Sequence, residues 1–291
     1  MKSIFYLNRR PWLFTFLLII FWVICNILIG IALILALQLG DYTQVPTPWP
    51  TLLSNLLTVF IVAPFVLGFP GKGHTYREFL SEIRLTKMKP LLGLILLGLS
   101  CYLIFALSQA AGVLVYRLVE GLPVDGDFIR RSFVLANELP PRSNSWLTTT
   151  LSIIEEIMWR GVVLAVFLRV YGHRKAILYS ALCFGLLHIL SVQNGYSLLY
   201  SLGNVVWAAI LGLFYGYVTL KADSLLPAMI VHYLGNLFVS AINAYIQANA
   251  SVQDVAIYGM VFTFGILPTA LMILWTHFFI TRWPINQSER D

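Results

Sequence analysis

Long apolar runs recur along the whole chain. They lie near residues 12–39, 51–69, 90–119, 146–170, 175–192, 197–220, 225–245 and 255–281. Runs of about twenty residues, at a rise of ~1.5 Å per helical residue, cross a hydrocarbon core ~30 Å thick. Residues 91–99 do not alternate between polar and apolar, as the strands of a membrane β-barrel do. The pattern therefore predicts an all-α fold, a polytopic transmembrane helical bundle of about eight spans.

The composition agrees with this pattern. Of 291 residues, 59% are hydrophobic and only 11% are charged, whereas about a quarter of a soluble domain is charged. We find no convincing internal repeat, so the simplest organisation is a single integral-membrane domain over 1–291. The mixed-charge segment 70–89 is expected to carry a short amphipathic helix at the membrane surface.

The net charge of +6 is explained by topology. With the N-terminus in the cytoplasm, fourteen of the nineteen Lys and Arg residues fall on the cytoplasmic side, and Arg160 lies within a span. The residues on the opposite side are Arg117, Arg130, Arg131 and Arg142. This bias follows the positive-inside rule and predicts that both termini are cytoplasmic. We therefore expect the lipid bilayer and no nucleic acid as a partner, and the plasma membrane or the endoplasmic reticulum as the location.

Few charged or titratable side chains lie deep in the predicted spans. Of thirteen acidic residues only Glu155 and Glu156 do so, and of the basic residues only Arg160. Of five histidines, only His188 and His232 lie deep. Because a charge at the bilayer centre costs roughly 2.5 to 3.5 kcal/mol on insertion scales, these residues are candidates for function.

The deep segment 155–160 contains two adjacent carboxylates that face different parts of the bundle. Glu156 and Arg160 are four residues apart and share a helix face, so the spacing predicts an ion pair that stabilises the helix. Glu155 points about 100° away from Glu156 and faces another part of the bundle. It is the carboxylate without a local partner.

The other deep residues can meet Glu155. His232 and Asn236 are four apart on one face, and a count of ~1.5 Å per residue places both at a depth similar to that of Glu155 and His188. A carboxylate, two imidazoles and an amide would supply a general base, its proton partner and donors for an oxyanion.

Three motifs carry a family resemblance. The chain has E-E-x-x-x-R at 155–160, F-x-x-x-H at 184–188 and H-x-x-x-N at 232–236, in this order on successive predicted helices. This set resembles the CPBP family, the CAAX proteases and bacteriocin-processing enzymes, also called the Abi family. The resemblance covers roughly 146–245, which we expect to be the catalytic core.

The resemblance implies an intramembrane endopeptidase. A water held by Glu155 and His188 would attack a peptide carbonyl while His232 and Asn236 stabilise the oxyanion. By the same resemblance, the catalytic residues are Glu155, His188, His232 and Asn236, and the supporting residues are Glu156 and Arg160. The expected substrate is a peptide or protein, either prenylated and of CAAX type, as for the eukaryotic relatives, or another membrane-associated peptide.

The resemblance leaves a metal open. The family is often labelled a metalloprotease, and Glu155, His188 and His232 could supply three zinc ligands with one open position. The chain lacks H-E-x-x-H, the zinc motif of many metalloproteases. We favour a metal-independent glutamate mechanism, with zinc as the alternative cofactor.

Two other functions compete with proteolysis. In a proton-coupled transporter the deep Glu and His residues would form a proton relay in broken helices. The prolines of the predicted spans lie mainly near span ends, which argues mildly against this; examples are Pro64, Pro227 and Pro268. A non-catalytic membrane immunity or scaffold protein would keep the fold without turnover.

Overall fold

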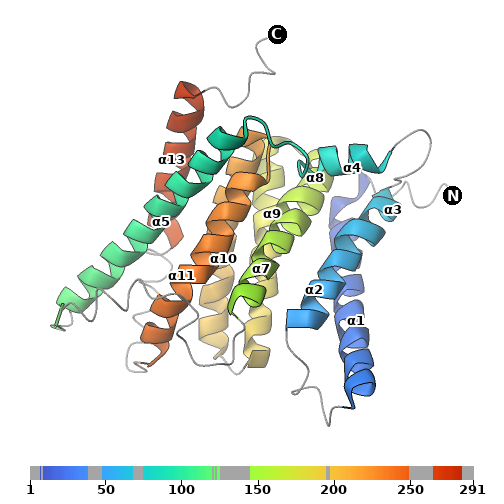
Figure 1. The fold of residues 1–291 in the computed structure, drawn as a ribbon, viewed down its shortest axis with the longest axis horizontal. Helices are drawn as coiled ribbons and strands as arrows, with labels where there is room; N and C mark the ends of the chain where they lie inside the picture. Colours follow the sequence, from blue (N-terminus) through green and yellow to red (C-terminus); the bar gives the residue numbers. More distant parts are fainter. Residues whose placement is uncertain are drawn as a thin grey trace.

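The computed structural model describes residues 7, 9–38, 48–67, 75–119, 121, 123–124, 145–194, 197–248 and 265–283. Every regular element within this part of the chain is helical (Figure 1), which confirms the all-α fold. In chain order, the elements are α1 (Pro11–Leu37), α2 (Pro48–Leu57), η3 (Thr58–Val62), α3 (Ala63–Leu67), α4 (Tyr76–Glu82), α5 (Leu91–Val119), α7 (Ser145–Glu156), η5 (Ile157–Val163), α8 (Leu164–Leu168), α9 (His173–Leu187), η6 (His188–Asn194), α10 (Leu198–Ala222), α11 (Leu226–Ala248) and α13 (Leu267–Arg282).

Each predicted span coincides with helical structure where it is described. By length and composition alone, four described helical segments could cross a membrane: Pro11–Leu37, Trp49–Leu67, Leu91–Gly112 and Leu198–Ala222. Helices α9 and α13 have only 15 and 16 residues, fewer than the ~20 that a span needs. The count of eight spans therefore stays a prediction. Residues 255–264 of the last span lie outside the described residues, as do Arg130, Arg131 and Arg142.

The helices that carry the three motifs lie in the middle of the bundle (Figure 1). Helix α10 packs against α9, α11 and α13, while α11 also packs against α5 and α7. Helices α1 and α2 form a pair, and α2 contacts α7. The start of α1 and the end of α13 both lie toward the upper end of the bundle in Figure 1. The two termini of the described helices thus share one end, and which side of the membrane it faces stays a prediction.

The short helix α4 lies across the upper end of the bundle, where an amphipathic helix was expected (Figure 1). It begins with a capping box, in which the Thr75 hydroxyl accepts from the Glu78 backbone N–H and the Glu78 carboxylate accepts from that of Thr75. Phe79 and Ile83 are buried in the core. They anchor the segment to the helices below it.

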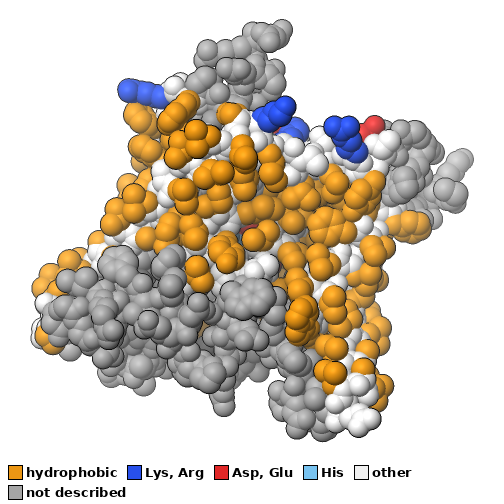
Figure 2. Space-filling model, in the orientation of Figure 1, with side chains coloured by type: hydrophobic (Ala, Val, Ile, Leu, Met, Phe, Trp, Pro, Cys, Tyr) orange, Lys and Arg blue, Asp and Glu red, His pale blue; other side chains and the backbone are white. Residues whose placement is uncertain are grey.

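Ion pairs gather at the same end. Arg169 Nη2 lies 2.6 Å from Glu82 Oε1, and Arg84 Nε lies 3.0 Å from Asp223 Oδ1. Lys87 also pairs with Asp223. On the face shown in Figure 2, Lys and Arg side chains line the upper edge, while apolar side chains cover the bundle below. Soluble monomers rarely expose contiguous apolar surface on this scale, so the chain is an integral membrane protein.

Close packing of α9 against α10 depends on one glycine. A Cβ atom at Gly185 would lie 2.7 Å from both Ala209 Cβ and the Val205 carbonyl oxygen. These neighbours belong to the α10 backbone or to a side chain too short to rotate away. Small residues are what allow helix backbones to approach this closely in lipid.

Substitution Gly185→Ala should therefore force α9 away from α10. We expect a loss of about 1–3 kcal/mol of stability, typical of overpacking, and a lower thermal midpoint in detergent. The control is Gly172→Ser, because a Cβ at Gly172 meets nothing within 4 Å and serine is favoured at a helix N-cap. Equal midpoints for the two variants would contradict this role of the glycine.

Candidate active site

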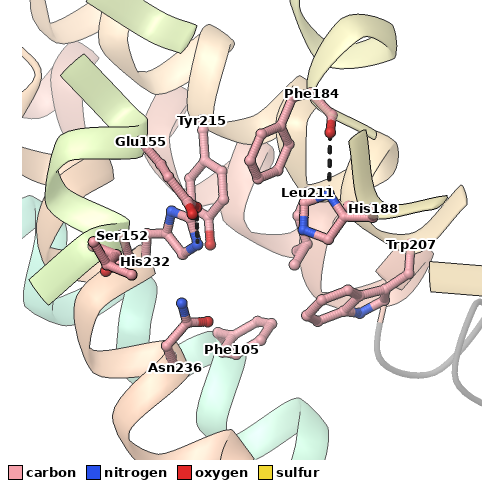
Figure 3. A pocket seen from close by; sticks show the side chains of 13 residues that line it. Phe105, Ser152, Glu155, Phe184, His188, Trp207, Leu211, Tyr215, His232 and Asn236 are labelled. Carbon is pink, nitrogen blue, oxygen red and sulfur yellow. Dashed lines mark hydrogen bonds and ion pairs between the residues drawn. The ribbon is translucent and has the colours of Figure 1, made fainter. Parts of the chain in front are cut away.

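A cavity of about 210 Å³ opens among α5, α7, α9, α10 and α11. Its polar lining comes from Ser152, Glu155, His188, Tyr215, His232 and Asn236. Figure 3 shows these side chains pointing toward a common space, from helices that are far apart in the sequence. The structure thus brings all four predicted catalytic residues to one cavity.

Two adjacent carboxylates differ sharply in exposure. The Glu155 side chain is 33% exposed and lines the cavity, whereas the Glu156 side chain is 0% exposed. Glu155 Oε2 lies 3.9 Å from His232 Nε2, too far for a direct hydrogen bond but close enough for one shared ligand or water. Glu155 is therefore the carboxylate that can meet a water molecule or a substrate.

The buried Glu156 carboxylate accepts two hydrogen bonds. Arg160 Nη1–H donates to its Oε1 over 3.0 Å, which is the ion pair that the sequence spacing predicts. His232 Nδ1 donates to the same oxygen over 2.7 Å. The second bond comes from another helix and fixes the orientation of the imidazole, so that Nε2 faces the cavity. Glu156 therefore does more than stabilise its own helix.

The Arg160 guanidinium lies among aromatic rings. Its Cζ is 4.1 Å from the ring centre of Phe184 and 5.0 Å from that of Tyr215. Both distances are within the range of cation–π attraction, which is stronger when the cation is desolvated. A Cβ at Gly212 would lie 3.0 Å from Arg160 Nη2, so the glycine leaves room for the cation.

The helix widens directly after Glu156. Residues Ile157–Val163 form a π-helix, and all seven are buried. The Ser180 hydroxyl donates to the Trp159 carbonyl over 2.8 Å, which gives a polar group of the irregular turn a partner away from water. Such π-bulges occur frequently at functional sites.

His188 stands where α9 ends and the 3₁₀-helix η6 begins. Its Nδ1 lies 3.0 Å from the Phe184 carbonyl oxygen. Because a carbonyl only accepts, Nδ1 carries the hydrogen, and the neutral ring presents an unprotonated Nε2. Figure 3 shows this second nitrogen turned toward the cavity. His188 can thus accept a hydrogen bond from a water molecule.

His232 and Asn236 face the cavity from α11, one helical turn apart (Figure 3). The His232 ring stacks on Tyr215, with 5.1 Å between ring centres and 20° between the planes. The stacking contact with Tyr215 fixes the plane of the imidazole ring, and the hydrogen bond to Glu156 fixes the rotation of the ring within that plane. This arrangement leaves an imidazole nitrogen and an amide side by side, opposite Glu155.

Residues 145–238 match the family model described as type II CAAX prenyl endopeptidase Rce1-like. This part of the chain is similar to the Rce1-like family. The match contains all three motifs and nearly coincides with the predicted core, 146–245. No curated protein and no solved structure matches the chain.

The Rce1-like family is a family of proteases. The cavity, which the matched segment lines together with Phe105, has a wall suited to apolar groups. Phe105, Trp207 and Leu211 line the cavity on the side away from Glu155 (Figure 3). Concave sites with apolar walls and a few converging polar groups are the usual form of substrate sites. A peptide with apolar side chains matches this lining.

Sequence reasoning missed two polar cavity residues in the Rce1-like segment, Ser152 and Tyr215. Tyr215 lies between Gly212 and Gly216, a spacing that predicts only helix packing. The sequence does show a polar tyrosine side chain within an apolar run that also contains two glycines. The run does not show which neighbouring helix the tyrosine faces, so its place in the cavity could not be predicted.

The alternative zinc site, formed by Glu155, His188 and His232, stays a prediction. Among the residues that the structure describes, no group of three or more His, Cys, Asp or Glu side chains is arranged to bind an ion. The Nδ1 atoms of His188 and His232 are already bonded to Phe184 and Glu156. Their Nε2 atoms face the cavity, and a histidine that binds a metal through one ring nitrogen usually donates from the other, so zinc stays the alternative cofactor.

The buried ion pair should govern stability. Substitution Arg160→Gln leaves the Glu156 carboxylate buried without its cation, a change that typically costs 3–5 kcal/mol. We expect a large fall in folded yield and in the thermal midpoint in detergent. The matched control is Arg169→Gln, which breaks a partly exposed pair with Glu82 and should cost at most about 1 kcal/mol. Similar losses for both variants would show that burial does not set the importance of the pair.

Proposed function

We propose that the protein is an intramembrane endopeptidase that cleaves near the C-terminus of prenylated CAAX-type or other membrane-associated peptides. The observation that carries the proposal is the contrast between two neighbouring carboxylates. Glu155 opens to the cavity, and Glu156 is sealed beneath it. The Rce1-like match over 145–238 supports the reaction class.

In the first step, a water molecule binds between Glu155 and His188 Nε2. Its oxygen attacks the peptide carbonyl carbon while Glu155 accepts one of its protons. The π electrons of the C=O bond move to the carbonyl oxygen. His232 Nε2–H and the Asn236 amide donate hydrogen bonds to this oxyanion.

In the second step, Glu155 returns the proton. The oxyanion re-forms the C=O bond, the C–N bond breaks, and its electron pair stays on nitrogen. The proton from Glu155 makes the leaving group a neutral amine. The other product is a carboxylic acid, and Glu155 is again a carboxylate, ready for another turnover.

The scheme keeps the charge of the centre balanced. It has His232 donate from both ring nitrogens, to Glu156 and to the oxyanion, so that the two carboxylates face two cations, Arg160 and His232, and the net charge of the buried group is zero. When water attacks, the negative charge of Glu155 moves to the substrate oxyanion and the sum does not change. A neutral sum is important because an unbalanced charge is costly in the bilayer.

The apolar wall of Phe105, Trp207 and Leu211 suits the aliphatic residues of a CAAX-type C-terminus. A prenyl group would bring the peptide to the membrane, since each buried CH₂ contributes ~0.8 kcal/mol to membrane binding. The proposed substrate class thus combines a lipid anchor with an apolar C-terminal peptide.

Loss of the Glu155 carboxylate should abolish turnover. With a fluorogenic prenylated CAAX peptide, we expect wild-type protein to cleave and Glu155→Gln to be slower by ~10²–10⁴-fold, the usual contribution of a general base. Glu82→Gln, at the end of the bundle, should cleave like wild type. A zinc chelator should leave the wild-type rate unchanged. Equal rates for Glu155→Gln and wild type would refute the assignment.

Removal of the Asn236 amide should affect chemistry more than binding. For Asn236→Ala we expect kcat to fall by ~10²–10³-fold, the effect of losing one oxyanion donor, with little change in KM. The control is Asn26→Ala, which removes a side-chain amide that bonds Thr51 across α1 and α2. If both variants keep wild-type kcat, Asn236 is an interhelical contact and not an oxyanion donor.

A further inference from the structure

We propose that the hydroxyl of Tyr215 is a third hydrogen-bond donor to the tetrahedral oxyanion. This inference rests on the peptidase function proposed above and adds a catalytic residue from α10 to those on α7, η6 and α11. Tyr215 belongs to none of the three sequence motifs.

The Tyr215 ring is held firmly. The residue is only 3% exposed, and its ring stacks on that of His232 with 5.1 Å between centres. The Arg160 guanidinium contacts the same ring at 5.0 Å. The contacts with His232 and Arg160 fix the plane of the Tyr215 ring, so the hydroxyl at the end of the side chain has a defined position.

The hydroxyl points into the cavity. Figure 3 shows it beside the cavity-facing nitrogen of His232, on the side that Glu155 and Asn236 also face. None of the hydrogen bonds in the described part of the chain involves this hydroxyl. A buried tyrosine O–H usually has a partner. A hydroxyl aimed into a cavity without one is available to a ligand there.

The chemistry of phenol suits this position. Its O–H donates a hydrogen bond to an anion without adding a charge. The charge balance between the two carboxylates, Glu155 and Glu156, and the two cations of the proposed scheme therefore does not change. His232 and Asn236 approach from one helix, and Tyr215 approaches from another. Donors fixed in advance around a developing charge stabilise it strongly in a site of low dielectric constant. A transition state held from two helices would be stabilised more than a flat ground-state carbonyl.

The test is Tyr215→Phe in the full chain, since phenylalanine keeps the ring and removes only the hydroxyl. With the prenylated CAAX peptide, we expect kcat to fall by about 10²-fold, as for other single oxyanion donors, with KM and the thermal midpoint close to those of wild type. The control is Tyr217→Phe on the same helix, outside the cavity lining, which should keep wild-type kcat.

Wild-type kcat for Tyr215→Phe would overturn the inference and leave the ring with a packing role only. A loss of kcat that is matched by a loss of folded protein would overturn it as well. Both results leave the proposed peptidase intact, because the wild-type protein still cleaves. Absence of cleavage by wild type, across prenylated and unprenylated peptides, would remove the proposed function and this inference with it.

Discussion

The centre of the structure depends on one fully buried carboxylate, Glu156. In a membrane such a charge persists only with partners, and Glu156 has two, Arg160 from its own helix and His232 from α11. Each partner imposes further constraints. Arg160 requires the space that Gly212 leaves and lies against two aromatic rings. His232, held at Nδ1, presents its other nitrogen to the cavity. The sealed ion pair thereby orients the groups that the proposed reaction uses.

Irregular backbone completes the arrangement. The chain changes from α-helix to π-helix directly after Glu156, and from α-helix to 3₁₀-helix at His188. Both changes occur next to residues that line the cavity. Helix α9 can lie close enough to α10 because Gly185 has no side chain. The positions of Glu155 and His188 therefore follow from packing as much as from sequence spacing, and the substrate cavity is what remains between tightly packed helices.

Sequence patterns predicted the helical class, the Glu156–Arg160 pair and the set of residues around the cavity. These features depend on local periodicity and on the cost of charge in lipid, and both can be read from one chain. The bond from Glu156 to His232, the π-helix and the stack of Tyr215 on His232 could not be predicted in this way. Each depends on which helix faces which, and regular 100° periodicity does not describe a π-turn. The span count, the orientation and the catalytic roles stay predictions.

The central claim is that Glu155 accepts a proton from a water molecule in an open cavity, while the neighbouring Glu156 carboxylate is buried and does not reach that cavity. Rescue by a small carboxylate tests this claim most directly. Glu155→Ala and Glu156→Ala would each be assayed for cleavage of the prenylated peptide with increasing formate. We predict that formate restores cleavage to Glu155→Ala, because the vacated position is open to the cavity, and not to Glu156→Ala. Undiminished cleavage by Glu155→Ala without formate, or rescue of Glu156→Ala alone, would contradict the claim.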